Sequence, residues 1–572
     1  MRALQRALGL SFAGGMICVA SATQAATISL LSTFQGAEGN GEIVDFSADG
    51  NTLVSTVGGA FKGVQIVEVG ADGSYTVRGS VDLSTAFGTA DDIDGASSTA
   101  LDPAGRGFGA VALIPDDNGG TVGKVALYDY RAGTADDARV LAVVDVGFHP
   151  DSVAFSADGN ALVVANEGEN TDTEDNPNAD TGTPGSVSVI DLSSVSALGD
   201  LSGVTNADVT TVDFLTAANF QPGASIDGLR NNRPANDALE TNIEPEFVQV
   251  SGDRAYVTLH EANAVAVLDL ETNTWENIFD LGTIEQTVDA SDRDGWIEID
   301  DLVTGLPMPD SLGLFTSGGM PYMVTANEGD FHPEDFDRAR IKDLGLDQID
   351  PDFLAALQAE YGPDDAFQAD ENLGRLRISL VDGLNADGLF EDFVMPGTRS
   401  FTIWNAETGE LVFDPGSLEP LLADLDPTYH NVDDGDIGEF DNRSDDKGPE
   451  PEALAVIDLG TAAYLAVGLE RQNGIMLWDI SNPFAPIFED YINNAVDASG
   501  ADFLRAPESL SFIRPEDSPT GSLLLLAGYE DNDGAIALYS IGVMEPGTAG
   551  LLGLGLMGLA AQRRRLHRAL AR

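Results

Sequence analysis

Residues 149–167 consist of His149-Pro150-Asp151, then SVAFSADGNALVVAN, then Glu167. The two apolar runs, SVAF and ALVVA, have the length and composition of short β-strands. The Ser-Ala-Asp-Gly sequence between them is typical of a hairpin turn. An acidic residue therefore stands just before the first predicted strand, and a second one stands just after the second strand.

The same unit recurs along the chain. Four further copies begin at Glu244-Pro245-Glu246, Pro309-Asp310, Glu450-Pro451-Glu452 and Pro507-Glu508, and they end at Glu261, Glu328, Glu470 and Glu530. A third strand is expected to open at Gly185, Asn263, Gly374, Gly474 and Gly534. Two weaker copies occupy residues 42–69 and 98–130. Seven such units, without convincing amphipathic helices between them, predict an all-β, seven-bladed β-propeller.

Long loop insertions separate the units, at Glu169–Pro184, 193–243, 271–307, 331–372 and 414–449. Residues 349–360, IDPDFLAALQAE, have helical spacing and predict a short helical insert. The early strand TISLLSTF at 27–34 could complete the last blade, which would close the ring and remove its exposed edges. A pair of β-sandwiches is the alternative, but it does not explain seven similar units.

A propeller would bring the two acids of each unit to one face, because the first strand crosses the blade and the second returns. Five units would then aim ten carboxylates at one opening: Asp151, Glu167, Glu246, Glu261, Asp310, Glu328, Glu452, Glu470, Glu508 and Glu530. Carboxylates so near to one another raise each other's pKa, or they require a bound cation. Ligands that are all oxygen favour calcium first, with magnesium or manganese behind it. Alternatively, these acids cap strand ends or pair with neighbouring basic residues, Arg443, Lys447 and Arg471.

Other polar groups give weaker signals. The histidines His149, His260, His332 and His430 could bind a softer metal or transfer protons, or could simply be polar loop residues. Residues 289–299, DASDRDGWIEI, match a calcium loop in part, because Asp289 lies one place before the expected first ligand. The acidic run at 432–448 predicts a solvated loop that an ion could order. No motif for covalent catalysis is found.

Composition excludes several classes of protein. The 572 residues contain 95 Asp and Glu against 28 Lys and Arg, a formal net charge of −67, and one cysteine. Such an acidic field repels nucleic-acid phosphates, so no nucleic-acid partner is expected. A single thiol excludes a disulfide framework and a thiolate zinc site. With 43% hydrophobic residues the chain can build a large core.

Both ends indicate targeting segments. Residues 1–26 contain Arg2 and Arg6, then an apolar stretch and small residues, which predict a signal peptide. Near the other end, an apolar run at 549–561 precedes three arginines, which favour the cytoplasmic side. We therefore expect a signal peptide at 1–26, a propeller domain at 27–542 and a sorting segment at 543–572, with membrane contact through the terminal segments only. A plain tail anchor or a fortuitous apolar end is the alternative for that last segment.

The final segment resembles the PEP-CTERM sorting signal, on the strength of Glu545-Pro546, the apolar run and the arginines after it. That resemblance implies an exosortase-type enzyme as partner, cleavage near the Glu-Pro pair, and a transmembrane tail until then. The processed protein would reside in the cell envelope, at the cell surface or in the extracellular matrix.

Several internal segments resemble the choice-of-anchor I family, bacterial surface and secreted propellers that carry varied C-terminal anchors. The most specific are TANEGDFHPEDFDRARIKDLGLD, RSFTIWNAETGELVFD and RSDDKGPEPEALAV, and the resemblance covers roughly residues 28–542. Some members carry alkaline-phosphatase-like names. The resemblance implies metal ligation by Glu167, Glu246, Glu328, Glu452, Glu470 and Glu508, and phosphate binding by Arg338, Arg340, Arg443, Lys447 and Arg471. His260 and Tyr529-Glu530 depart from the family's usual residues.

Two functions follow from these patterns. The first is an exported, envelope-sorted propeller that binds a metal, calcium first, and acts as a surface or extracellular-matrix binding protein. The alternative is a metal-dependent phosphoesterase that uses the same acidic mouth. In that case Arg443 or Arg471 would stabilise developing charge, and His260 is a further catalytic candidate. The sequence does not identify the ligand.

Overall fold

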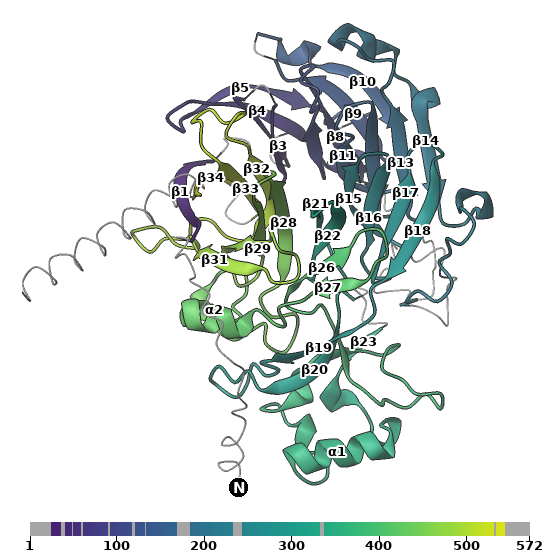
Figure 1. The fold of residues 1–572 in the computed structure, drawn as a ribbon, viewed down its shortest axis with the longest axis vertical. Coiled ribbons are helices and arrows are strands. Elements are labelled where there is room, and N and C mark those ends of the chain that lie inside the picture. The colour runs from purple at the N-terminus through teal and green to yellow at the C-terminus, as the bar shows by residue number, and fades with distance from the viewer. Residues whose placement is uncertain are drawn as a thin grey trace, which may run out of the picture. The chain divides into compact units, whose positions relative to one another are not determined.

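Most of the regular secondary structure belongs to small β-sheets, nearly all of them antiparallel, and helices are few (Figure 1). The computed structural model describes residues 25–543 except for 36–40, 49, 59–60, 90–91, 117–119, 132, 169–182, 233–238, 240–242, 332–336 and 531–533. Residues Thr27–Ile541 form one compact unit.

Seven sheets within the described residues contain four strands or more. The first two comprise β2 (Val44–Phe46), β3 (Thr52–Val57), β4 (Gly63–Val69) and β5 (Tyr75–Asp82), then β6 (Ile93–Gly95), β7 (Thr99–Leu101), β8 (Phe108–Pro115), β9 (Lys124–Asp129) and β10 (Val140–Asp145). The next two comprise β11 (Pro150–Phe155), β12 (Ala161–Asn166), β13 (Ser186–Asp191) and β14 (Val209–Asp213), then β15 (Pro245–Ser251), β16 (Arg254–Leu259), β17 (Ala264–Asp269) and β18 (Thr274–Asp280).

The remaining three sheets lie in the second half of the chain. They comprise β21 (Leu312–Ser317), β22 (Met320–Ala326), β26 (Phe401–Asn405) and β27 (Leu411–Phe413), then β28 (Pro451–Asp458), β29 (Ala463–Leu469), β30 (Ile475–Asp479) and β31 (Ile487–Ile492), and finally β32 (Pro507–Ile513), β33 (Leu524–Tyr529), β34 (Ala535–Gly542) and β1 (Thr27–Phe34). The early strand β1 is hydrogen-bonded beside β34, as the sequence predicts.

The first strands of these sheets contact one another in circular order. Strand β2 contacts β7, and the contacts continue through β11, β15, β21, β28 and β32 back to β2. Figure 1 shows the sheets following one another around the unit in chain order. This arrangement, with β1 and β34 joining the two ends of the chain in one sheet, is that of a β-propeller.

The degree of burial of a strand determines how clearly its apolar pattern can be recognised in the sequence. The middle strands are covered on both faces by neighbouring sheets, so β3, β29 and β33 are buried along their whole length. Strands β29 and β33 read as nearly continuous apolar runs for that reason, whereas β3 also buries Thr and Ser side chains. The outer strands β5 and β14 are largely exposed or half-buried. Because of this weak apolar pattern, β14 falls in the insertion expected at 193–243, and β5 falls outside the predicted units.

One predicted third strand is wrong. The run that opens at Gly374 does form a strand, β24 (Arg377–Ser379), but it pairs with β23 (Arg338–Arg340) in a separate two-stranded sheet. The third strand beside β22 is β26, at Phe401–Asn405. Apolar alternation predicts that a segment is a strand, but it does not predict which strand it pairs with. Here the long insert contains β23, and β24 pairs with that strand.

The insert has a small core of its own, around Phe367, Phe390 and Phe393. It contains β19 (Ile284–Val288), β20 (Asp301–Leu306) and β25 (Val394–Pro396), which form a three-stranded sheet. The predicted insert helix is present as α1 (Pro351–Tyr361); Asp350 caps it by accepting N–H bonds from Asp352 and Phe353. A second short helix, α2 (Glu419–Leu425), was not predicted.

Most of the two predicted targeting segments, at 1–24 and 544–572, lies outside the described residues. Within the part of the chain that the structure describes, no helix is long and apolar enough to cross a membrane.

Two tryptophans provide a matched test of the packing between sheets. Trp275 on β18 is fully buried and stacks on Phe214 with 4.5 Å between ring centroids, whereas Trp296 is 64% exposed. Because Trp275→Ala leaves a large cavity, we expect it to lower the free energy of unfolding by about 3–5 kcal/mol in urea titrations. Trp296→Ala should change it by less than about 0.5 kcal/mol. Equal effects of the two substitutions would contradict the packing described here.

Candidate cation site in the central cavity

A cavity of about 610 Å³ lies where the first strands of the sheets begin. Its wall includes residues from all seven of those strands or from the turns that precede them. Eight of the ten predicted carboxylates line it: Asp151, Glu167, Glu246, Glu261, Asp310, Glu328, Glu452 and Glu508. Glu42, Asp45, Asp330 and His260 also line the cavity, and sequence reasoning assigned the three acids no role.

The other two predicted acids lie close by. Glu470 is buried and shares a cluster with Glu328 and Glu450, in which one carboxylate oxygen of each lies within 4.8 Å of the others. Glu530 is exposed, and its charge contributes to raising the pKa of Glu42 and of Glu508, after burial. The structure therefore gathers the acids as the repeat predicts, with Glu530 at the margin.

Backbone geometry after each proline turns the acids inward. The register shifts between Pro150 and Ser152, so Asp151 has no partner across the strand pair, and Glu508 is unpaired in the same way. Such bulges re-aim side chains. The residue before the proline has a left-handed backbone in four units, with φ of 44° at His149, 41° at Met308, 51° at Glu450 and 52° at Ala506. A left-handed backbone conformation is uncommon for residues other than glycine. Its recurrence at the same position in four units shows that the units share this turn.

Hydrogen bonds across the same ends fix the pairs of acids. The Glu167 N–H donates to His149 O at 2.9 Å, and the Glu470 N–H donates to Glu450 O at 2.9 Å. The Glu530 N–H donates to Ala506 O at 3.0 Å. Each second-strand acid is thereby held beside the start of its first strand, which is why the sequence spacing predicts the pairing.

The carboxylates strongly perturb one another. Burial, together with the charge of Glu167, raises the pKa of Asp151 to about 7. Burial and Glu328 raise the pKa of Asp310 to about 8. The same two causes, burial and neighbouring carboxylates, raise the pKa of Glu246, Glu452 and Glu508 well above the usual range. A cavity of this kind holds either protons or cations at neutral pH.

One group of three carboxylates has the separation that a metal ion requires. Asp310, Glu328 and Glu452 each offer an oxygen within 4.8 Å of the other two. Glu452 is 8% exposed and its Oε2 has no hydrogen-bond partner among the described residues. The same holds for His260 Nε2, which lies 4.0 Å from Glu328 Oε2. Burial lowers the pKa of His260, but Glu261, Glu328 and Asp330 outweigh burial and raise it.

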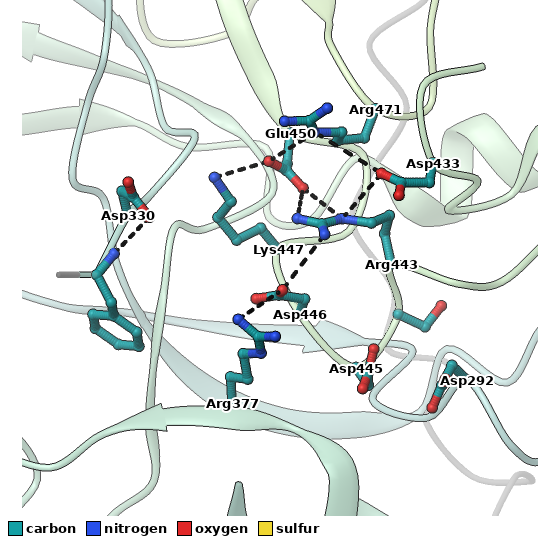
Figure 2. Close-up of polar contacts among 12 residues, drawn as sticks. Asp292, Asp330, Arg377, Asp433, Arg443, Asp445, Asp446, Lys447, Glu450 and Arg471 are labelled. Atoms are coloured by element: carbon teal, nitrogen blue, oxygen red, sulfur yellow. Dashed lines mark hydrogen bonds and ion pairs between the residues drawn. The ribbon is translucent and has the colours of Figure 1, made fainter. Parts of the chain in front are cut away.

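Three basic side chains, Lys447, Arg443 and Arg471, surround Glu450, as Figure 2 shows. Arg443 Nε lies 2.9 Å from Glu450 Oε1, and Lys447 Nζ lies 2.8 Å from Glu450 Oε2. Lys447 also pairs with Glu328, and Arg471 pairs with Glu470 at 2.8 Å and with Asp434. We call residues 441–450 the cation arm, because this segment carries Arg443 and Lys447 to the acids.

Glu450 is the functional residue that sequence reasoning missed. It is fully buried, and although burial alone would raise its pKa, Lys447, Arg443 and Arg471 lower that pKa to about 2. The signal was available, since Glu450 stands directly before Pro451 in the repeat. In the unit at 149–167 the residue before the proline is His149, whose Nδ1 lies 2.5 Å from Glu167 Oε2.

The other candidate cations lie elsewhere. Arg338 and Arg340 are on β23, neither lines the cavity, and Arg340 pairs with Asp445. His430 is buried outside the cavity, and His332 lies outside the described residues.

The role of Glu450 can be tested by removing its charge. Glu450→Gln keeps the shape of the side chain but leaves Arg443 and Lys447 without their shared buried counterion. We expect the free energy of unfolding to fall by about 3–5 kcal/mol in urea titrations with chelator present. Asp434→Asn, which removes a 40% exposed partner of Arg471, should change it by less than about 1 kcal/mol. A Glu450→Gln protein as stable as the wild type would contradict this role.

The raised pKa values predict how the stability of metal-free protein depends on pH. Asp151 and Asp310 keep their protons to about pH 7 and about pH 8 when folded, but lose them near their ordinary pKa when unfolded. The native state then binds more protons, so the free energy of unfolding should fall as the pH rises from about 5 to about 8, and level off above that. Urea titrations in chelator at several pH values measure this trend. Stability that rises over the same interval would contradict it.

Distant relatives are found among animal proteins. Gigasin-3a of Magallana gigas is 28% identical over 195 residues, which cover 31% of this chain and 67% of that protein. The mesenchyme-specific cell surface glycoprotein of Strongylocentrotus purpuratus is 26% identical over 268 residues, which cover 41% of this chain. The match spans 33% of the length of that glycoprotein.

Solved structures with a similar course of the chain include the RRP9 WD40 repeats, with a TM-score of 0.43, 10% identity, and coverage of 91% of this chain and 100% of that one. The periplasmic gluconolactonase PpgL of Pseudomonas aeruginosa has a TM-score of 0.41 and 14% identity, covering 86% of this chain and 95% of that one. The family model of the choice-of-anchor I domain matches residues 42–483, well over half of the chain. The chain therefore belongs to the choice-of-anchor I domain family.

Proposed function

We propose that this protein is an exported, surface-associated propeller that binds calcium in its central cavity and uses the bound ion to hold a surface or matrix ligand. The observation that carries the proposal is the group of Asp310, Glu328 and Glu452, three converging carboxylates on the wall of one cavity. Family membership supports an extracytoplasmic, surface-associated location. The name of the sea urchin relative, a cell surface glycoprotein, agrees with that location.

We propose further that the seven sheets of four or more strands are the seven blades of one ring. The circular order of contacts among their first strands supports this count, and so does the pairing of β1 with β34. A closed ring explains why acids from distant units meet, since each first strand must begin at the same central opening.

Calcium is the cation that the donor set favours. The three converging side chains offer oxygen only, and calcium takes six to eight oxygen ligands in flexible geometry. Further carboxylates line the same cavity, so a second ion could be accommodated beside the first. Binding would displace the protons that the acids otherwise hold, and it would relieve their mutual repulsion.

A surface role is supported by the shape of the site. The ion would face a cavity of about 610 Å³, large enough for part of a polymer or a small molecule to complete its coordination. Sorting of the C-terminal segment by an exosortase-type enzyme would then place this cavity at the cell envelope. That segment lies outside the described residues.

The phosphoesterase alternative draws on Arg443, Lys447 and Arg471 beside the cavity. In the structure these cations are paired with Glu450, Glu328 and Glu470. A phosphate would have to replace carboxylates on all three cations, whereas calcium would compete with only one of them, Lys447, for Glu328. The binding function is therefore the better supported of the two.

Calorimetric titration of chelator-treated protein with calcium tests the proposal. Glu452→Gln removes one of the three oxygen donors, and we expect it to weaken binding at least tenfold, about 1.4 kcal/mol. The control is Glu530→Gln, the same chemical change at an exposed predicted ligand that does not line the cavity, which should weaken binding less than about threefold.

Wild-type protein that binds no calcium, or equal effects of the two substitutions, would contradict the proposal. The same samples should be assayed with p-nitrophenyl phosphate. Calcium-dependent turnover that Glu452→Gln abolishes would replace the binding function by the phosphoesterase.

A further inference from the structure

A second cluster of metal-binding side chains lies outside the central cavity. Asp289, His430 and Asp441 each offer one ligand atom within 4.8 Å of the other two. Their exposed fractions are 1%, 0% and 3%, and none of them lines the cavity. The function proposed above makes no use of them.

Three loops are held together to form this cluster. Asp289 directly follows β19, and its Oδ2 accepts the Glu298 N–H at 3.0 Å. The Asp441 N–H donates to His430 O at 3.0 Å, and Asp441 has a left-handed backbone with φ of 69°. The run at 432–448, expected to be a solvated loop, is instead buried at Asp441, Ser444 and Asp445. Its polar side chains are covered because they bond to one another and to the insert.

In the calcium loop expected at 289–299, the carboxylate of Asp292 is already paired with basic side chains. Arg375 binds Asp292 through both Nε and Nη2, with Nη2 to Oδ2 at 3.0 Å, and Arg293 also pairs with Asp292. Asp289, one place before the motif's expected first ligand, is the residue that joins a cluster. The two residues it meets, His430 and Asp441, are more than a hundred positions away in the sequence.

The hydrogen bonds within the cluster do not provide a partner for every polar atom of its side chains. His430 Nε2 lies 3.0 Å from Asp289 Oδ2 and 4.0 Å from Asp441 Oδ1. Two carboxylates thus face one imidazole nitrogen, which can donate a single hydrogen bond to one of them. Asp441 Oδ2 is buried without a hydrogen-bond partner among the described residues. Buried polar atoms of this kind are costly unless a ligand binds them.

We propose that Asp289, His430 and Asp441 form a second metal site, separate from the central cavity, for a divalent transition metal, with zinc as the first candidate. Imidazole suits zinc and its neighbours in the transition series, whereas calcium and magnesium take oxygen. Zinc takes both histidine nitrogen and aspartate oxygen as ligands, and three protein ligands leave its fourth position for water or another ligand. A metal among the three would satisfy both carboxylates at once.

This site would fix the beginning of the cation arm. Ser444 Oγ donates to Asp441 Oδ1 at 2.6 Å, and the Arg443 N–H donates to Asn431 O at 2.9 Å. The ligands His430 and Asp441 are therefore tied directly to the residues beside Arg443. A metal here would hold the segment that presents Arg443 and Lys447 to Glu450.

Calorimetry and elemental analysis of chelator-treated, full-length protein titrated with zinc test the proposal. Wild-type protein and Glu452→Gln should each bind one equivalent, because Glu452 belongs to the central cavity. His430→Gln and the nearly isosteric Asp441→Asn should each bind it at least tenfold more weakly. Calcium in excess should leave this equivalent of zinc in place.

Circular dichroism of each variant establishes that it is folded. Cobalt, substituted for zinc in the wild-type protein, gives a readout independent of the variants, because a nitrogen ligand alters its visible absorption. Zinc binding that His430→Gln and Asp441→Asn leave unchanged would overturn the proposal, as would zinc that is lost with Glu452→Gln. Failure of calcium binding alone would count against the central site and leave this one standing.

Discussion

Carboxylates at the inner ends of the sheets repel one another, and the rest of the structure has to offset that repulsion. The circular order of the first strands brings acids from five repeats to one cavity. Burial then removes most of the water that would otherwise screen them, so Asp310 and Glu452 hold their protons far above the usual pH range. Protons, basic side chains and metal ions are the three means by which such a cavity can be neutralised.

The basic side chains act on one side only. The long segment between β26 and β28 delivers Arg443 and Lys447 to Glu450, and Arg471 follows β29 to the same carboxylate. Glu450 consequently has a lowered pKa, whereas Glu452, two residues later, has a raised one. This contrast separates Glu450, neutralised by the cation arm, from Asp310 and Glu452, which face the cavity and still need protons or a metal. The proposed calcium ion would bind Asp310 and Glu452 together with Glu328, whose Oε1 also pairs with Lys447.

Much of this arrangement is predictable from the sequence, because the position of each acid relative to the two strands of its unit determines where that acid lies in the fold. An acid before one strand and an acid after the next must meet when the strands form a hairpin, and Asp151 and Glu167 do so. What the sequence could not supply is long-range pairing. Nothing in the run at Gly374 indicates that it pairs with β23 rather than β22, and nothing near Asp289 points to His430 or Asp441. The outer strands were missed because half-exposed edges need little apolar pattern.

Anomalous diffraction from crystals grown with terbium, an oxygen-seeking substitute for calcium, would locate the ion in the central cavity. We expect a peak within bonding distance of carboxylate oxygens of Asp310, Glu328 and Glu452, which a crystal grown in excess calcium would lack. Terbium that binds elsewhere on the protein, with those three carboxylates still protonated or paired only with one another, would contradict this expectation.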